Sequence, residues 1–178
     1  SKIGEMIMNK TIYLAGGCFW GVQAYMKKLP GVLETETGYA NGKTERPAYE
    51  EVCKNDTGHA ETVRVVYDPD ILPLGILLKA FFKVVDPTQL NRQGGDVGTQ
   101  YRNGVFYAEA EDKAVIEEMI AYLQTKYQEE VVTEVKPLEN FYPAEEYHQY
   151  YLDKNPTGYC HINLFDAEEF IRENGLEN

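Results

Sequence analysis

The order of short strand-type and helix-type segments constrains the fold most strongly. Five segments have the β-branched and aromatic residues, and the flanking turn residues, that are typical of strands: residues 11–15, 32–39, 60–67, 104–108 and 131–135. Three segments repeat apolar residues at every third or fourth position, which predicts amphipathic helices: residues 19–29, 74–85 and 110–127. The chain therefore follows the order β-α-β, then β-α-β, and then one more helix and strand.

This order is the split β-α-β pattern. It predicts the α+β class: a two-layer sandwich in which helices pack on a small mixed sheet with a ferredoxin-like core. Three long segments, residues 40–59, 88–103 and 138–163, contain all three histidines and half of the 14 tyrosines. Long connections in compact domains are usually functional, so we expect them to form the site.

The helix patterns also predict which side chains are buried. In the third helix we expect the apolar stripe to consist of Val115, Ile116, Met119, Ile120, Leu123 and Tyr127.

Length and charge limit the number of domains and the kinds of partner. We predict a single domain over residues 11–178 and an N-terminal extension over residues 1–10, left over in part from cloning, because the chain opens with Ser1 rather than Met. A second limit comes from charge: the formal net charge of −12 argues against broad binding to nucleic acid or to anionic membranes. The most apolar stretch, residues 71–85, is interrupted by Lys79 and Lys83 and is not expected to span a membrane.

The three cysteines, Cys18, Cys53 and Cys160, are too few and odd in number for a secreted disulfide framework. They fit a reducing compartment in which thiols stay free, so we expect a cytoplasmic protein.

Cys18 is the strongest candidate for chemistry. It follows Gly16 and Gly17 at a strand-to-helix junction, where the positive end of the helix dipole is expected to lower its pKa. Gly21 weakens the first turn of this helix, which indicates that space is needed there. The alternative is a core cysteine packed beside two core aromatic residues.

The segment Gly17-Cys18-Phe19-Trp20-Gly21 resembles the active-site signature of the peptide methionine sulfoxide reductase A family. Further blocks follow in the family's order: Gly38–Gly42, Tyr49–Cys53, Gly58–Glu61, Gly94–Arg102, Tyr147–Leu152 and Asn155–His161. The resemblance covers roughly residues 11–164.

The resemblance implies reduction of the S-epimer of methionine sulfoxide, free or in oxidised proteins, to methionine. Cys18 would be the nucleophile, and Glu61 the acid, a role that requires burial to raise the pKa of its carboxyl group. Tyr49 and Tyr101 would direct their hydroxyls at the sulfoxide oxygen, and Asp96 would help to position that network.

The same resemblance assigns the remaining roles. The substrate methyl group would lie against Phe19 and Trp20. Cys18 would become a sulfenic acid and then form a disulfide with Cys160, recycled by thioredoxin, or by dithiothreitol in vitro, without a bound cofactor. We interpret Cys53, on a short helix, as structural.

Two further features of the matched blocks remain open. His59 and His148 are each either functional or hydrogen-bonded structural histidines. The Tyr159-Cys160-His161-Ile162 block resembles A-type domains fused to a B-type reductase domain, so such a domain is a candidate partner.

Two other classes compete with this interpretation. A thiol peroxidase or glutaredoxin-like protein also uses a thiolate at a helix N-terminus, but the chain has no Cys-x-x-Cys motif. A metal-binding module would use the three cysteines and a histidine, but their spacing matches no usual zinc pattern, and we predict no metal site.

Overall fold

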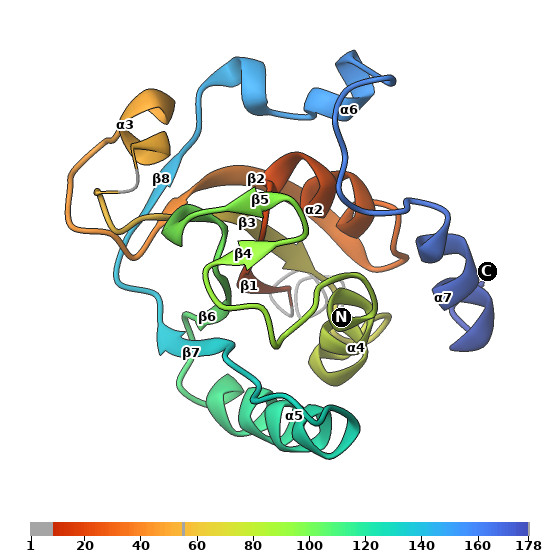
Figure 1. Cartoon of the computed structure of the whole chain (residues 1–178). Helices are drawn as coiled ribbons and strands as arrows, with labels where there is room; N and C mark the ends of the chain where they lie inside the picture. The colour runs from red at the N-terminus through yellow and green to blue at the C-terminus, as the bar shows by residue number, and fades with distance from the viewer. Residues whose placement is uncertain (1–8, 55, 178) are drawn as a thin grey trace.

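Six strands of the computed structural model, which describes residues 9–54 and 56–177, form one curled sheet in the order β7-β6-β1-β3-β2-β8 (Figure 1). The strands of this sheet are β1 (Lys10–Gly16), β2 (Val32–Ala40), β3 (Ala60–Tyr67), β6 (Asn103–Tyr107), β7 (Glu134–Pro137) and β8 (Phe141–Pro143). A separate two-stranded ribbon consists of β4 (Arg92–Gln93) and β5 (Asp96–Val97).

Strand pairing confirms the split β-α-β order. Strand β3 lies between β1 and β2 and is antiparallel to both, with Leu14 opposite Val63 and Tyr39 opposite Glu61. Strand β6 is antiparallel to β1 on its other side. The pairing of β6 with β7 is parallel, which makes the sheet mixed, as predicted.

The helices are α2 (Phe19–Met26), α3 (Tyr49–Cys53), α4 (Leu74–Val84), α5 (Asp112–Lys126), α6 (Tyr151–Lys154) and α7 (Asp166–Glu173), with 3-10 turns η1 (Thr99–Tyr101) and η2 (Glu146–His148). Helices α2 and α4 bury their apolar sides in one core with the inward-facing residues of β1 and β3, among them Ile12 and Val65. Alternate residues of a strand point to opposite faces, so this core occupies one side of the sheet. The predicted two-layer α+β arrangement is confirmed.

Three local predictions were wrong. Helix α2 ends at Met26 rather than at residue 29, because the amides of Lys28 and Leu29 donate to the carbonyls three residues before them, which makes this segment a turn. Strand β7 begins at Glu134, three residues later than expected, because the Val132 amide donates to the carbonyl of Pro87 instead of pairing in the sheet. In α5, Ile116 and Leu123 are buried, whereas Val115 is 37% exposed, so the predicted apolar stripe is too wide. The helix packs on α4 and also contacts β6 and β7.

The C-terminal segment is tied across the start of the fold. After β8, the Gln149 side chain accepts a hydrogen bond from the Thr37 amide and donates to the carbonyls of Thr37 and Ala144. The Tyr150 amide then donates to the side chain of Gln23 in α2. From α6 the chain runs beside α2 to α7 (Figure 1). These bonds place the segment that contains Cys160 against the helix that begins after Cys18.

No helix within residues 9–54 and 56–177 is both long and apolar enough to cross a membrane. Of the predicted N-terminal extension, residues 1–8 lie outside the described residues. Lys10 is the first residue of β1, so the sheet begins one residue earlier than predicted.

Candidate active site

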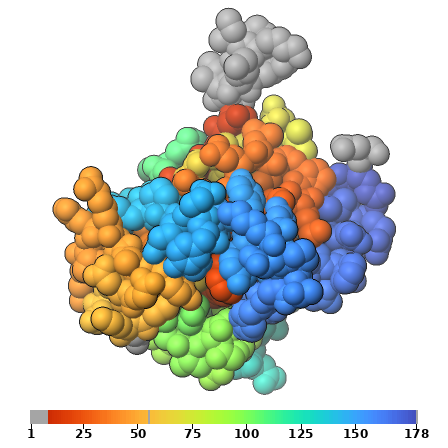
Figure 2. Space-filling model, turned by 90° about the horizontal axis from the view of Figure 1, so that it is seen from above, coloured from red at the N-terminus to blue at the C-terminus, as the bar shows by residue number. Residues whose placement is uncertain are grey.

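Cys18 is the N-cap residue of α2, at the junction that the sequence predicts. The turn depends on the preceding glycine: Gly17 has a φ of +86°, and a Cβ there would lie 2.8 Å from Cβ of Gln93. Glycine is therefore required both by the backbone conformation and by the close approach of β4. Figure 2 shows a small red-orange area, the colour of the β1–α2 region, between the orange, green and blue segments that border it.

The surroundings of the Cys18 thiol oppose its ionisation. Only 8% of the residue is exposed, and this burial raises its pKa. The Glu61 carboxyl raises the pKa further, while the amides of Trp20 and Gly21 donate to the sulfur and lower it. The net shift is upward, so the expected lowering by the helix terminus is wrong for the protein alone: burial outweighs the helix terminus.

Glu61 lies at the start of β3 and is 1% exposed. Its Oε1 accepts a hydrogen bond of 3.1 Å from the amide of Phe19, the residue next to Cys18. Its Oε2 is buried and has no hydrogen-bond partner among the described residues. Burial raises the pKa of Glu61 to about 8, against the lowering effect of the Phe19 amide, so the carboxyl group is largely protonated at neutral pH.

The connection over residues 88–103 brings Tyr101 and Asp96 to the site. Tyr101 ends the turn η1, and its pKa is raised by burial first and then by the nearby Glu61, Cys18 and Asp96. Asp96, in β5, accepts a hydrogen bond of 2.9 Å from the hydroxyl of Tyr159. The 88–103 segment and the C-terminal segment therefore meet beside Cys18.

Tyr49 is the first residue of α3 and is half-buried. Its ring lies 4.4 Å from that of His148, and its side chain is hydrogen-bonded to Cys53. Burial and this hydrogen bond raise the pKa of Tyr49, as does the charge of Glu61. Cys53 lies on a short helix, as predicted, but it is exposed rather than packed in the core.

The aromatic residues after Cys18 form the apolar side of the site. The Phe19 ring is buried, 5.7 Å from that of Tyr39. Trp20 stacks on Tyr151 with ring centroids 3.7 Å apart, and its indole N–H donates to Nδ1 of His148 at 3.0 Å. An apolar side chain or methyl group is the ligand that this surface favours.

Cys160 lies close to α2. A Cβ at Gly21 would be 3.2 Å from its sulfur, which explains why glycine occupies the first helical turn. The thiol donates to the carbonyl of Ile162 at 3.1 Å, and all three cysteines are free. Cys18 and Gly21 are three residues apart and thus share one side of α2, so Cys160 is near the side of the helix on which Cys18 lies.

The histidines have different surroundings. Nδ1 of His59 accepts from the Gly42 amide, and Nε2 bonds to the carbonyl of Thr44, so this histidine holds the loop before α3. His148 contacts the site directly through Trp20 and Tyr49. Its Nε2 is buried and has no partner among the described residues.

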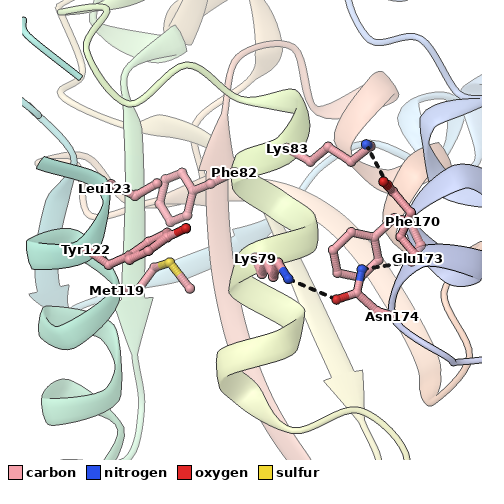
Figure 3. Close-up of a pocket in the computed structure, with 9 residues that line it drawn as sticks. All are labelled: Lys79, Phe82, Lys83, Met119, Tyr122, Leu123, Phe170, Glu173 and Asn174. Atoms are coloured by element: carbon pink, nitrogen blue, oxygen red, sulfur yellow. Dashed lines mark hydrogen bonds and ion pairs between the residues drawn. The ribbon is translucent and has the colours of Figure 1, made fainter. Parts of the chain in front are cut away.

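A candidate metal cluster and the hollow between three helices both lie away from Cys18. In the described part of the chain, one group of side chains is close enough to share a metal ion: Glu109, Glu111 and Asp112. Lys10 forms ion pairs with Glu109 and Asp112 of this group. A hollow of about 460 Å³ lies between α4, α5 and α7 (Figure 3), with Lys83 bridging to Glu173 at one side. It contains no thiol and none of the predicted site residues.

Sequence reasoning missed three residues of the site. Glu145 bonds to Tyr39 and Tyr49, Tyr159 bonds to Asp96, and Tyr151 stacks on Trp20. Tyr151 and Tyr159 lie inside matched blocks, but among 14 tyrosines nothing in the pattern singles them out.

Replacing Glu61 with Gln is expected to change how stability depends on pH. Between its ordinary pKa of 4.5 and about 8, the unfolded chain releases the Glu61 proton while the folded protein keeps it. Folding stability from this group is complete below pH 4.5 and is lost, by about 1.4 kcal/mol per pH unit, as pH rises towards 8. In urea unfolding, the free energy of unfolding of Glu61→Gln should therefore rise relative to that of the wild type between pH 5 and 8. Parallel stability curves would show that Glu61 ionises at its ordinary pKa.

Comparisons with known proteins agree on one family. The model of the family described as peptide methionine sulfoxide reductase matches residues 10–177. The curated protein Peptide methionine sulfoxide reductase MsrA of Lachnoclostridium phytofermentans is 57% identical over 162 residues, 90% of this chain and 98% of that protein.

Solved structures give the same result. Reduced Mxr1 from Saccharomyces cerevisiae has a TM-score of 0.83 at 41% identity, over 88% of this chain and 92% of that chain. Mxr1 in complex with Trx2 has a TM-score of 0.59 at 26% identity, over 82% and 86% of the two chains. Because the family model spans nearly the whole sequence, this chain belongs to the peptide methionine sulfoxide reductase family and is an oxidoreductase.

Proposed function

We propose that the protein reduces the S-epimer of methionine sulfoxide, free or in oxidised proteins, by attack of Cys18 on the sulfoxide sulfur. The observation that supports this most strongly is the buried carboxyl group of Glu61, bonded to the amide next to Cys18 and with its pKa raised to about 8. A sulfoxide oxygen gains negative charge as its sulfur is attacked, and a neutral carboxyl group can donate a proton to it.

The first step transfers oxygen. As the Cys18 sulfur forms a bond to the sulfoxide sulfur, its thiol proton is released and Glu61 gives its own proton to the oxygen. The S–O bond of the substrate and the new S–S bond then break as the hydroxyl passes to Cys18, which becomes a sulfenic acid, and Glu61 takes up a proton again. The substrate leaves as methionine, reduced by two electrons, while the Cys18 sulfur is oxidised by two. Tyr49 and Tyr101 donate hydrogen bonds to the same oxygen. Asp96, which accepts a hydrogen bond from Tyr159, helps to position these donors.

The two sides of the site support selection of a single epimer. The apolar side, Phe19 and Trp20, receives the terminal methyl group, and the hydroxyls of Tyr49 and Tyr101 together with Glu61 receive the oxygen. With the methyl group and the oxygen fixed on different sides, only one configuration at sulfur leaves the sulfur facing Cys18 with the rest of the substrate directed to solvent.

The second step recycles the enzyme. The Cys160 thiol attacks the Cys18 sulfenic acid, a disulfide forms and water leaves. The position of Cys160 against Gly21 supports this pairing. A thioredoxin then takes the disulfide by thiol–disulfide exchange, which the known complex of Mxr1 with Trx2 supports. We place this repair of oxidised proteins in the cytoplasm, where thiols stay reduced.

The function is tested directly by offering each epimer of methionine sulfoxide to the reduced protein without a recycling reductant. Methionine should form from the S-epimer only, one equivalent per chain, and mass spectrometry should show two thiols lost as a Cys18–Cys160 disulfide. Reduction of both epimers, or loss of thiols involving Cys53, would contradict the proposal.

Replacing Cys160 with Ser should separate the two steps. The variant keeps Cys18 and the oxygen-binding residues, so one equivalent of methionine should still form and Cys18 should remain a sulfenic acid. Steady-state turnover driven by thioredoxin should be lost, whereas dithiothreitol, a small thiol, should still support it. Undiminished thioredoxin-driven turnover would remove the relay, and Cys18→Ser, which should form no methionine, serves as the control.

Replacing Glu61 with Gln should slow oxygen transfer by roughly 10²- to 10⁴-fold, because the amide cannot give up a proton. Gln keeps the size and the acceptor oxygen for the Phe19 amide, so substrate affinity should change little. Rapid-quench measurement of methionine in one turnover provides the test. A single-turnover rate equal to that of the wild type would exclude Glu61 as the acid.

A further inference from the structure

Glu145 joins two parts of the site and itself lies 106 and 96 positions further along the chain than its two partners. Its Oε1 accepts a hydrogen bond of 2.7 Å from the hydroxyl of Tyr39, and its Oε2 accepts one of 3.0 Å from the backbone amide of Tyr49. One carboxylate therefore connects strand β2 with the first residue of α3.

The Tyr39 end of this bridge is fixed. Tyr39 is fully buried in β2, opposite Glu61 in β3, and its ring packs 5.7 Å from that of Phe19. Glu145 itself follows Ala144, whose amide donates to the carbonyl of Thr37 in the same strand. Strand β2 therefore fixes Glu145 twice, through the side chain of Tyr39 and through the main chain of the preceding residue.

At the other end of the bridge, the main chain of Tyr49 has less support from the rest of the fold. Helix α3 has only five residues and lies outside the sheet, in the connection between β2 and β3. The ring of Tyr49 rests on His148 and its hydroxyl meets Cys53, but both contacts hold the side chain. Glu145 holds the main chain of Tyr49 and so sets the point from which the side chain extends.

Glu145 is in the ionisation state that accepts both hydrogen bonds. Burial acts to raise its pKa, but the amide of Tyr49 and the hydroxyl of Tyr39 donate to it, and its pKa stays below the usual range. The group is therefore a carboxylate at neutral pH and accepts both hydrogen bonds.

We propose that Glu145 is a positioning residue for oxygen transfer: by bridging Tyr39 and the main chain of Tyr49, it sets where the Tyr49 hydroxyl lies relative to Cys18 and Glu61. The proposal rests on the proposed function, in which Tyr49 donates to the sulfoxide oxygen. Small displacements of such a donor lower the rate of the chemical step more than they lower affinity.

A double-mutant cycle between Glu145→Ala and Tyr49→Phe tests this proposal through the single-turnover rate of methionine formation. In the wild-type background, Glu145→Ala should lower the rate at saturating substrate about tenfold and change the half-saturating concentration less than about twofold. In the Tyr49→Phe background, where no hydroxyl remains to be positioned, the same change should have less than about a twofold effect.

Two variants complete the design. Glu145→Gln should stay within about threefold of the wild type, because its amide oxygen accepts from Tyr49 and its NH₂ group donates to Tyr39. Glu146→Ala should leave the rate unchanged, because the neighbouring Glu146 side chain is 90% exposed and forms a surface ion pair with Lys154. Should Glu145→Ala fail to fold, Glu145→Asp replaces it, since the shorter carboxylate cannot reach both partners.

An equal loss of rate in both backgrounds would overturn the proposal, because Glu145 would then act independently of the Tyr49 hydroxyl. An unchanged rate in Glu145→Ala would overturn it as well. Failure of the proposed function is distinct, since the wild-type protein itself would then form no methionine from the S-epimer.

Discussion

The burial of the Glu61 carboxyl group against the amide of Phe19 is the interaction on which the rest of the site depends. Pairing of Leu14 with Val63 brings the end of β1 beside the start of β3, so Cys18 and Glu61 meet although 42 residues separate Phe19 from Glu61. Burial opposes the charged form of both groups. The protein therefore holds a protonated acid beside a protonated thiol.

Each of the three long connections brings at least one further side chain to this pair. The 41–59 connection supplies Tyr49, the 88–103 connection supplies Asp96 and Tyr101, and the C-terminal segment supplies Cys160. The sheet fixes only Cys18 and Glu61. The other groups depend on side-chain bonds between segments, such as Glu145 to Tyr49 and Tyr159 to Asp96. This division suits the proposed relay, in which Cys160 approaches Cys18 while Cys18 and Glu61 stay in place.

The order of the five predicted strands along the chain and the position of Cys18 could be predicted because they depend on local patterns: runs of β-branched and aromatic residues between turns, and a Gly-Gly pair before a helix. The role of Gly21 was also readable as a need for space, which Cys160 fills. The pKa of Cys18 was not, because its direction depends on how deeply the helix terminus is buried. Glu145 could not be found either, since a single carboxylate among 29 acidic residues gives no periodic signal. Likewise, only the bond from Val132 to Pro87 explains the late start of β7.

Infrared difference spectroscopy of the Glu61 carboxyl group tests the central claim most directly. The carbonyl stretch of a protonated carboxylic acid, assigned by its loss in Glu61→Gln, should be present at pH 7 and should disappear with a midpoint of about pH 8. Its presence at pH 7 would establish a neutral acid beside Cys18. A Glu61 that is already a carboxylate at pH 6 would contradict the account, because the site would then hold no proton to give to the sulfoxide oxygen.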